Sequence, residues 1–419
     1  MLLNLAREFL LRPNPTPRGW DAPHAVRIVL AALSIGLLPL GTNLMTPLFP
    51  VFQERMLLGN GAVTAAFVAY VLPVVIGLPL LGHWSEYMGR RVVLVASLAI
   101  GILAATVLLF ASGLPGLLGG RALHGLAVAL SFGAGAAALR DLLPGEPSLC
   151  ARIILLASVG GGAAGPLVGG WLSELGDPVG APFSVYLAAM VAVVVLLAAV
   201  RAFPPTLAPP PRGFLGSLRP PRLSLPRPIL KIFSLTSGMG FLSFAVYGFF
   251  LSVAPAFYAP MLGGSRIMGG LSGALVLAGS ACAQLLPVRG RHKATMSLVV
   301  MVIGLVLIVV AQLQQLTGLL LIAATLVGLS QGVGFRTLFA ALNSELPSET
   351  AAQTVSLVYV ITYLGSAIPV LCLGLAMDFW GATAAVNAFL MGAAGAALIF
   401  AALCMFIDHQ RQCRTANGP

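Results

Sequence analysis

Long apolar runs recur along the whole chain and are separated by short polar breaks. Each run is continuous and holds about 20 or more residues, the length that a helix needs to cross a bilayer. Strands of a membrane barrel alternate apolar and polar positions, so the continuous runs favour helices. The pattern predicts twelve spans, at approximately residues 26–53, 62–83, 92–112, 115–139, 151–173, 182–203, 229–257, 267–287, 295–313, 317–342, 352–377 and 381–406.

The composition supports a chain that lives in a membrane. Of its 419 residues, 58% are hydrophobic and only 8% are charged, and the mean hydropathy is +0.99. A soluble domain carries roughly 25% charged residues. These values exclude a soluble enzyme, and the expected fold class is an all-α polytopic membrane protein.

The formal net charge of +11 is explained by where the cations lie. Nearly all of the 23 lysines and arginines fall in polar breaks that face inward if the N-terminus is cytoplasmic. Only Arg55 and Arg266 fall on the other side, and Arg121 and Arg336 lie within predicted spans. By the positive-inside rule, both termini are expected in the cytoplasm, with the chain in a bacterial-type inner (plasma) membrane. The cations therefore indicate topology rather than a nucleic-acid partner.

The largest polar insertion, residues 204–228, is rich in proline and holds four arginines and no acid. Proline prevents a continuous helix, so a stiff cytoplasmic linker is expected here. It would join a six-helix bundle at 26–203 to a second at 229–406. Residues 1–25 are expected as an amphipathic segment on the cytoplasmic membrane surface, and 407–419 as a cytoplasmic tail.

A short internal repeat supports the same division. Residues 139–146 (LRDLLPGE) resemble residues 342–349 (LNSELPSE), and each stretch follows the fourth predicted span of its half. Parallel repeats of this kind are a known transporter architecture. The sequence therefore predicts two pseudo-symmetric six-helix bundles.

The loop between the second and third predicted spans carries the sequence GHWSEYMGRR, with Gly82, Glu86, Gly89, Arg90 and Arg91 at its key positions. It resembles the signature loop of the major facilitator superfamily, Gly-x-x-x-Asp-Arg-x-Gly-Arg-Arg, with Glu86 in place of the aspartate and a tyrosine in place of one cation. The glycines allow a tight turn, and the acid and arginines can form charge-assisted bonds. The resemblance covers residues 26–406 and implies two halves that rock around a central cavity.

In the fourth span, the stretch RALHG resembles the second motif of this superfamily, Arg-x-x-Gln-Gly, with His124 in place of glutamine. Arg121 and His124 are three residues apart and share a helix face. An arginine inside a span is costly unless it meets a wet cavity or a partner. We expect Arg121 to contact substrate and His124 to be a candidate for carrying a proton. Snorkelling of Arg121 and simple helix packing of His124 are the alternatives.

The fifth span holds the run GGAAGPLVGG, with Gly161, Gly165, Pro166, Gly169 and Gly170. Small residues let helices approach closely, and the proline bends the helix. The Gly-Pro-x-x-Gly-Gly pattern resembles the motif associated with exporters that exchange substrate for protons. Within the superfamily, the chain is most similar to 12-helix drug/metabolite:proton antiporters. Close packing alone remains the alternative interpretation.

Charge inside the predicted cavity points to the class of substrate. Those antiporters commonly carry an acid where this chain has Asn43, and none of the twelve acids falls in the middle third of a predicted span. An anionic, zwitterionic or neutral polar substrate is therefore favoured over a cation. Arg336 is a second candidate for substrate binding or gating. Tyr247, Tyr359 and Tyr363 are candidates to line the cavity, with packing as the alternative.

Four acids occupy matching positions after the fourth span of each half: Asp141, Glu146, Glu345 and Glu349. Basic residues of the signature loop and of the corresponding loop near Arg289 are expected to pair with the acids of the opposite half. Such pairs would form an inner gate when the cavity opens outward. Partly exposed pairs contribute only about 0–1 kcal/mol each, so they would bias a conformational equilibrium.

No nucleotide-binding loop, zinc spacing or nucleophile elbow is present, and the five cysteines are unpaired in spacing. We therefore expect no enzyme activity, no metal and no cofactor. The expected function is secondary active transport by a monomer, with proton-driven export of a small amphiphilic metabolite or drug. One alternative is proton-coupled uptake of an organic anion. Another is a transport-inactive signalling or lipid-handling membrane protein.

Overall fold

The computed structural model describes residues 22–200, 206–208, 229–285, 288, 290, 292–346 and 351–416, with side chains left undescribed at 351–353 and 407–416. Nearly all of these residues are helical. In the described part, 12 helical segments are long and apolar enough to cross a membrane, which confirms the all-α polytopic fold class. Residues 1–21, most of 204–228 and the last three residues of the tail lie outside the described residues.

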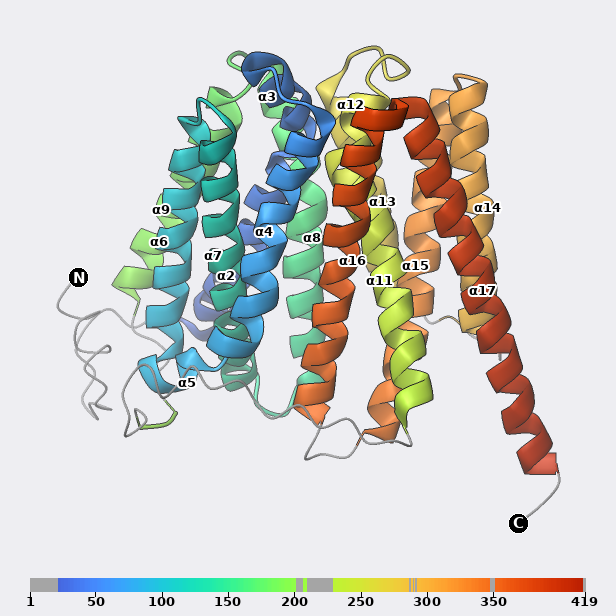
Figure 1. Cartoon of the computed structure of the whole chain (residues 1–419). Helices are drawn as coiled ribbons and strands as arrows, with labels where there is room; N and C mark the ends of the chain where they lie inside the picture. Colours follow the sequence, from blue (N-terminus) through green and yellow to red (C-terminus); the bar gives the residue numbers. More distant parts are fainter. Residues whose placement is uncertain are drawn as a thin grey trace. The chain divides into compact units, whose positions relative to one another are not determined.

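The chain divides into two compact units. One contains Met1–Leu58 and Ala66–Pro221, and the other contains Gly59–Ala65 and Arg222–Pro419. The described helices of the first unit are α2 (His24–Leu44), a 3₁₀ turn (Thr46–Leu48), α3 (Phe49–Met56), α4 (Asn60–Leu81), α5 (Trp84–Met88), α6 (Arg90–Leu109), α7 (Leu114–Leu142), α8 (Pro147–Glu174) and α9 (Gly180–Ala199). Figure 1 labels these helices. The first turn of α4 groups with the second unit.

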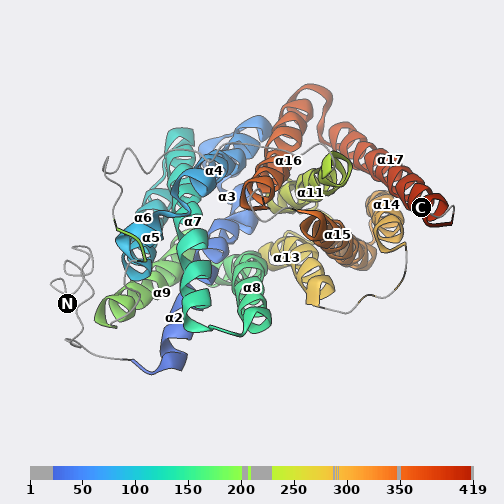
Figure 2. The same ribbon diagram turned by 90° about the horizontal axis from the view of Figure 1, so that it is seen from below.

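The described helices of the second unit are α11 (Leu230–Ser252), α12 (Ala254–Phe257), α13 (Arg266–Leu285), α14 (Lys293–Leu313), α15 (Thr317–Glu345), α16 (Ala351–Trp380) and α17 (Ala382–Ala416). Within it, α11, α15 and α16 lie side by side, as Figure 2 shows in the end-on view. Its buried core is built from apolar side chains such as Met239, Val246, Phe249, Leu305 and Val327.

Helix neighbours in each unit follow one pattern. In the first unit, α2 packs on α8, α6 on α7, and α6 on α9. The corresponding pairs of the second unit are α11 on α16, α14 on α15, and α14 on α17. Pro166 in α8 and Pro369 in α16 also match, because they are separated by the same number of positions as Leu139 and Leu342. The two units are thus structural repeats, in agreement with the predicted pseudo-symmetry.

Three predicted spans, the first, the seventh and the last, differ from the helices by more than a small shift of their ends. The seventh, 229–257, is divided at Val253 into α11 and α12. The first span is not one continuous helix, because a 3₁₀ turn at Thr46–Leu48 separates α2 from α3. Pro47 lies in that turn and Pro50 at the start of α3, where a missing N–H and a fixed φ are tolerated. The last helix, α17, continues through Ala416, although the sequence places the end of the span at 406.

Candidate functional site

Arg121 of α7 is fully buried inside the first unit, at 0% exposure. Its Nη1 donates a hydrogen bond to the carbonyl oxygen of Thr42 at 2.8 Å. Its Nε and Nη2 point at the carbonyls of Ala66 and Phe67, at 3.3 and 3.4 Å. The guanidinium carbon lies 5.7 and 5.0 Å from the ring centres of Phe67 and Tyr70, which is within cation–π range. The side chain therefore connects α7 to α2 and α4.

His124, one turn further along α7, is also 0% exposed and meets a different partner. Its Nε2 lies 3.2 Å from the hydroxyl oxygen of Tyr186 in α9, and the two rings stack at 6.0 Å. Its Nδ1 has no hydrogen-bond partner among the described residues. Gly41 of α2 leaves room for the tyrosine, because a Cβ there would overlap the Tyr186 ring. The structure thus places His124 between helices of one bundle.

The glycines of α8 form a close seam with α2. A Cβ added at Gly161, Gly165 or Gly169 would lie 2.2–2.4 Å from a backbone carbonyl oxygen of α2. Asn43 joins the same seam, because its Nδ2 donates to the carbonyl of Gly162 at 3.0 Å. Pro166 and Gly170 are buried beside it. The residues of the predicted exporter motif therefore come together with Asn43, although the sequence did not connect the two.

The signature loop forms the turn that the glycines predicted. Gly89 has φ of 93°, a left-handed conformation that favours glycine, and it precedes α6. Arg90 donates through Nε to Asp141 Oδ2 at 3.0 Å and through Nη1 to Ser85 Oγ at 2.8 Å. Arg91 donates to the carbonyl of Val200. The loop arginines thus connect neighbouring helices of the first unit.

Two further members of the signature loop approach other segments. The carbonyl of Glu86 accepts hydrogen bonds from the backbone N–H groups of Thr206 and Leu207, at 3.0 and 2.8 Å. The carbonyl of Gly82 lies 2.3 Å from where a Cβ at Gly133 of α7 would stand. Close contact with α7 at this point therefore depends on the glycine at 133.

Three of the four predicted gate acids lie at or beside helix ends. Asp141 lies near the end of α7 and pairs with Arg90, with the aspartate side chain 44% exposed. Glu146 directly precedes α8, and Glu345 is the last residue of α15. Glu349 lies outside the described residues. A gate between these acids and the basic loops of the opposite half remains a prediction.

In the second unit, Arg336 of α15 is exposed and donates through Nη1 to the carbonyl of Gln284 in α13, at 2.8 Å. Gln284 in turn lies 3.5 Å from the hydroxyl of Ser280, which also shares a hydrogen bond with Tyr247 of α11. A polar line thus runs across α15, α13 and α11. Arg336 and Tyr247, predicted independently, belong to one network.

The two remaining predicted tyrosines lie on α16 in contact with aromatic rings. Tyr363 meets Phe244 edge-on at 5.2 Å, and Phe244 meets Tyr247 at 5.5 Å. Tyr359 is 39% exposed and lies 6.0 Å from Phe339. Tyr247 and Tyr363 therefore share a ring cluster, whereas Tyr359 belongs to a separate one.

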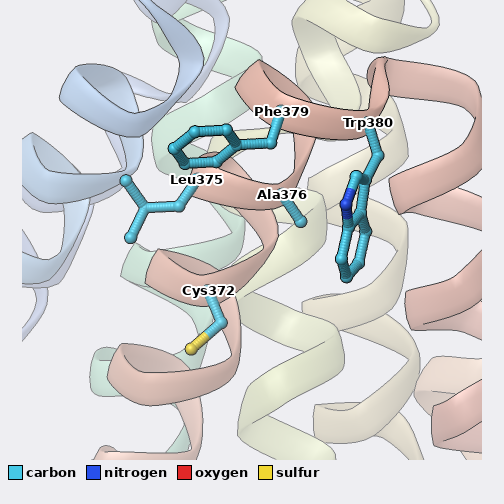
Figure 3. A pocket seen from close by; sticks show the side chains of 5 residues that line it. All are labelled: Cys372, Leu375, Ala376, Phe379 and Trp380. Carbon is cyan, nitrogen blue, oxygen red and sulfur yellow. The ribbon is translucent and has the colours of Figure 1, made fainter.

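An apolar depression of about 450 Å³ lies on α16 and is lined by Cys372, Leu375, Ala376, Phe379 and Trp380 (Figure 3). Phe379 and Trp380 are 83% and 73% exposed. Aromatic residues at the end of a membrane helix are typical of the membrane–water interface. The depression thus suits lipid chains better than a polar substrate. Within the described residues, no group of three or more His, Cys, Asp or Glu side chains gathers as a metal site requires.

Sequence reasoning missed the contact between Asp378 of α16 and the start of α4. Asp378 Oδ1 accepts hydrogen bonds from the backbone N–H and the side-chain Nδ2 of Asn60, at 3.0 and 2.9 Å. Oδ2 accepts one from the N–H of Gly61 at 2.8 Å. A carboxylate at a helix N-terminus satisfies free N–H groups and complements the helix dipole. The partners are more than 300 residues apart in the chain, so no local signal could have revealed them.

We expect Asp378→Ala to destabilise the protein by about 1–2 kcal/mol, because several donors at the start of α4 lose their acceptor. Asp378→Asn keeps one acceptor oxygen and should lose less. Thermal unfolding of the purified protein in detergent measures both variants. An alanine variant that unfolds at the parent temperature would show that water replaces the carboxylate without loss.

Residues 31–370 match a protein family described as the Major Facilitator Superfamily. MFS-type transporter TwmF from Talaromyces wortmannii is 28% identical over 186 residues, which are 42% of this chain and 34% of that protein. Tetracycline resistance protein, class E, from Escherichia coli is 32% identical over 161 residues, which are 37% of this chain and 39% of that protein. The chain thus aligns with less than half the length of these relatives.

Solved structures of similar shape cover nearly the whole chain. A bacterial homologue of the human lysosomal transporter Spinster, in an inward-facing and unoccupied conformation, has a TM-score of 0.72 at 13% identity, over 93% of this chain and 98% of that one. A D-xylose-proton symporter has a TM-score of 0.70 at 14% identity, over 91% of this chain and 97% of that one. At such low identity, these likenesses show the fold alone.

The 12 helical segments of the described residues that are long and apolar enough to cross a membrane define a multi-pass membrane protein. The chain belongs to the major facilitator superfamily. This confirms the resemblance found in the signature loop.

Proposed function

We propose that the chain exports a small amphiphilic metabolite or drug in exchange for protons, by alternating access in the inner membrane of a bacterial-type cell. The observation that carries export is the seam between α8 and α2, where Gly161, Gly165 and Gly169 contact the backbone that carries Asn43. This is the run that resembles the exporter motif. The likeness to a tetracycline resistance protein supports the same direction. We place both termini and residues 204–228 in the cytoplasm, on the positive-inside rule.

Proton-coupled uptake of an organic anion is the second candidate, favoured by the exposed guanidinium of Arg336. In this site the guanidinium of Arg336 would supply the positive charge, and the hydroxyls of Ser280 and Tyr247 would supply neutral hydrogen-bond donors. Arg121 supports this candidate less, since its N–H groups already point at backbone carbonyls. In either case, we propose a neutral or anionic substrate rather than a cation. A transport-inactive signalling or lipid-handling role is the third candidate.

Proteoliposomes with an imposed pH gradient distinguish the three candidates. If the protein exports in exchange for protons, we expect tetracycline to move in the direction opposite to the proton flow. If it imports an anion, we expect benzoate to move in the same direction as the protons. Ethidium serves as the cationic control and should not be transported. If none of the three probes moves with any imposed gradient, the proton-driven transport proposal is wrong for these classes.

His124→Gln tests the proton carrier in the same vesicles, because glutamine is the residue of the superfamily motif and cannot titrate. We propose that His124 carries the proton, which its unpartnered Nδ1 would accept. The expected result is transport that no longer responds to the pH gradient while folding is unchanged. An unaltered response would exclude His124 as the proton carrier. The remaining candidate would be Glu54, an exposed acid of α3 at the end of the first span, or transport would use no proton.

A further inference from the structure

Among the buried side chains of the second unit whose polar atoms have no hydrogen-bond partner in the described residues, three lie on α11, α15 and α16 at neighbouring levels. Their unpartnered atoms are Oε1 and Nε2 of Gln331 in α15, Oγ of Ser243 in α11 and Oγ1 of Thr362 in α16. Gln331 and Thr362 are 0% exposed, and Ser243 is 3% exposed. Lipid offers no hydrogen bonds within the bilayer, so unsatisfied polar groups inside a span are costly and indicate function.

Several other hydroxyls of the same helices bond to a backbone carbonyl of their own helix. Thr236, Ser330 and Ser366 each donate to a carbonyl three or four residues earlier. This is the ordinary solution for serine and threonine in membrane helices. Ser243 and Thr362 have the same option and do not use it, so their hydroxyls are available to a ligand.

Helix register places Gln331 beside Ser243. Thr236 also donates to the carbonyl of Leu338 at 3.1 Å, which fixes the level of α11 against α15. A residue seven positions from this bond along either helix lies two turns away, at about 10 Å, and on the same helix face. That step reaches Ser243 on α11 and Gln331 on α15. The helices are antiparallel, because further along α11, at Gly240, the contact on α15 is the earlier residue Phe335. The step from Thr236 to Ser243 and the step from Leu338 to Gln331 therefore run in the same direction in space.

Thr362 of α16 packs against the backbone of Gly240 in α11, where glycine leaves room for its hydroxyl. A Cβ at Gly240 would lie 2.2 Å from Thr362 Oγ1 and 3.1 Å from a ring carbon of Phe335. Gly240 lies one turn from Ser243, and Phe335 lies one turn from Gln331. The three side chains with unpartnered atoms thus surround one short stretch of α11.

The cluster is neutral and lies beside aromatic rings. Arg336, the nearest cation along α15, is five residues from Gln331 and bonds to α13, so it points to another face. Phe335 stacks with Phe339 at 5.4 Å and an interplanar angle of 19°. A primary amide offers a donor and an acceptor side by side, and the two hydroxyls each offer both.

We propose that Gln331, Ser243 and Thr362 form a substrate-binding site for the neutral, amide-like edge of a planar ring compound. This rests on the proposed function, since it defines the substrate class that the transporter takes. The aromatic neighbours receive the ring face, and Gln331 pairs with the donor and acceptor of the edge.

Three isosteric probes test this class: benzamide is neutral, benzoate is an anion and benzamidine is a cation. Thermal unfolding of the purified full-length protein is measured with each at saturating concentration. We expect benzamide to raise the unfolding temperature by about 2–4 °C, and the charged probes to raise it less. No shift with benzamide, or an equal or larger shift with benzoate, overturns the assignment. This assay needs no gradient, so its outcome is independent of whether transport is proton-driven.

Gln331→Met removes both amide atoms at nearly equal volume, and the benzamide shift should disappear while the unfolding temperature without probe does not fall. Gln312→Met is the matched control, because Gln312 is another buried glutamine of this unit with an unpartnered oxygen, in α14. It should keep the full shift. Thr362→Val should weaken the shift and provides a second test should Gln331→Met fail to fold. A full benzamide shift in Gln331→Met or Thr362→Val overturns the proposal.

Discussion

Replacement of Arg121 by methionine is expected to leave a folded protein whose transport rate falls by at least about tenfold. Methionine fills most of the arginine volume without a charge, and a buried ionic group replaced by a well-packed apolar one is often neutral or stabilising. The lost interactions are hydrogen bonds from a charged group to α2 and α4. One such bond contributes about 1.5–3 kcal/mol. If these bonds stabilise the helix arrangement that transports, their loss should lower the transport rate by at least about tenfold. Flux of the transported probe in vesicles and thermal unfolding in detergent measure the two effects.

Arg55→Met is the matched control for this prediction. Arg55 is an arginine of the same unit, and its bond to Asp177 at 3.2 Å joins side chains that are 50% and 60% exposed. Exposed pairs of this kind contribute little, so this variant should transport like the parent. If Arg121→Met transports at the parent rate, Arg121 is neither a substrate ligand nor an essential link between helices. If it fails to fold, its role is structural.

A single methyl group at Gly161 is expected to destabilise the protein by about 1–3 kcal/mol or more. A Cβ there would lie 2.2 Å from the carbonyl oxygen of Gly36, and backbone cannot turn aside as a flexible side chain can. The helices α2 and α8 must therefore separate. Thermal unfolding and the yield of purified protein measure the effect of Gly161→Ala.

Gly160→Ala provides the control at the neighbouring residue. A Cβ at Gly160 meets nothing within 4 Å, and alanine favours a helix over glycine by up to about 1 kcal/mol. This variant should be as stable as the parent or more so. Equal unfolding temperatures for the two alanine variants would contradict the close contact between α2 and α8.

The membrane fold follows from the sequence because its main determinant is local. A helix needs about 20 apolar residues to cross a bilayer, and such runs are visible without any knowledge of tertiary contacts. Ends are less predictable. Polar residues after 406 suggest a tail, yet α17 continues to Ala416, because a helix that leaves the membrane needs no apolar side chains to keep its backbone bonded.

The sequence allowed single residues of the candidate site to be predicted, but not the partners that these residues contact. A buried arginine in a span signals a special role, and Arg121 is indeed fully buried. Its acceptors are backbone carbonyls, which every residue has, so the sequence gives no sign of which ones it meets. Arg121 and His124 were expected to act from one face, yet His124 meets Tyr186 of α9. Gln331 was not singled out because one uncharged amide in an apolar span resembles a residue of ordinary helix packing.

The backbone contact between α2 and α8 also has a consequence for measurements of motion. Side chains between two helices can change rotamer and let one helix slide, but at Gly161, Gly165 and Gly169 no side chain lies in between. These two helices must keep a constant spacing while other parts of the protein rearrange. Val29 of α2 and Leu156 of α8 are 53% and 55% exposed, so spectroscopic labels can be attached there. Such a pair forms an internal ruler of fixed length, against which distance changes elsewhere in the molecule can be calibrated.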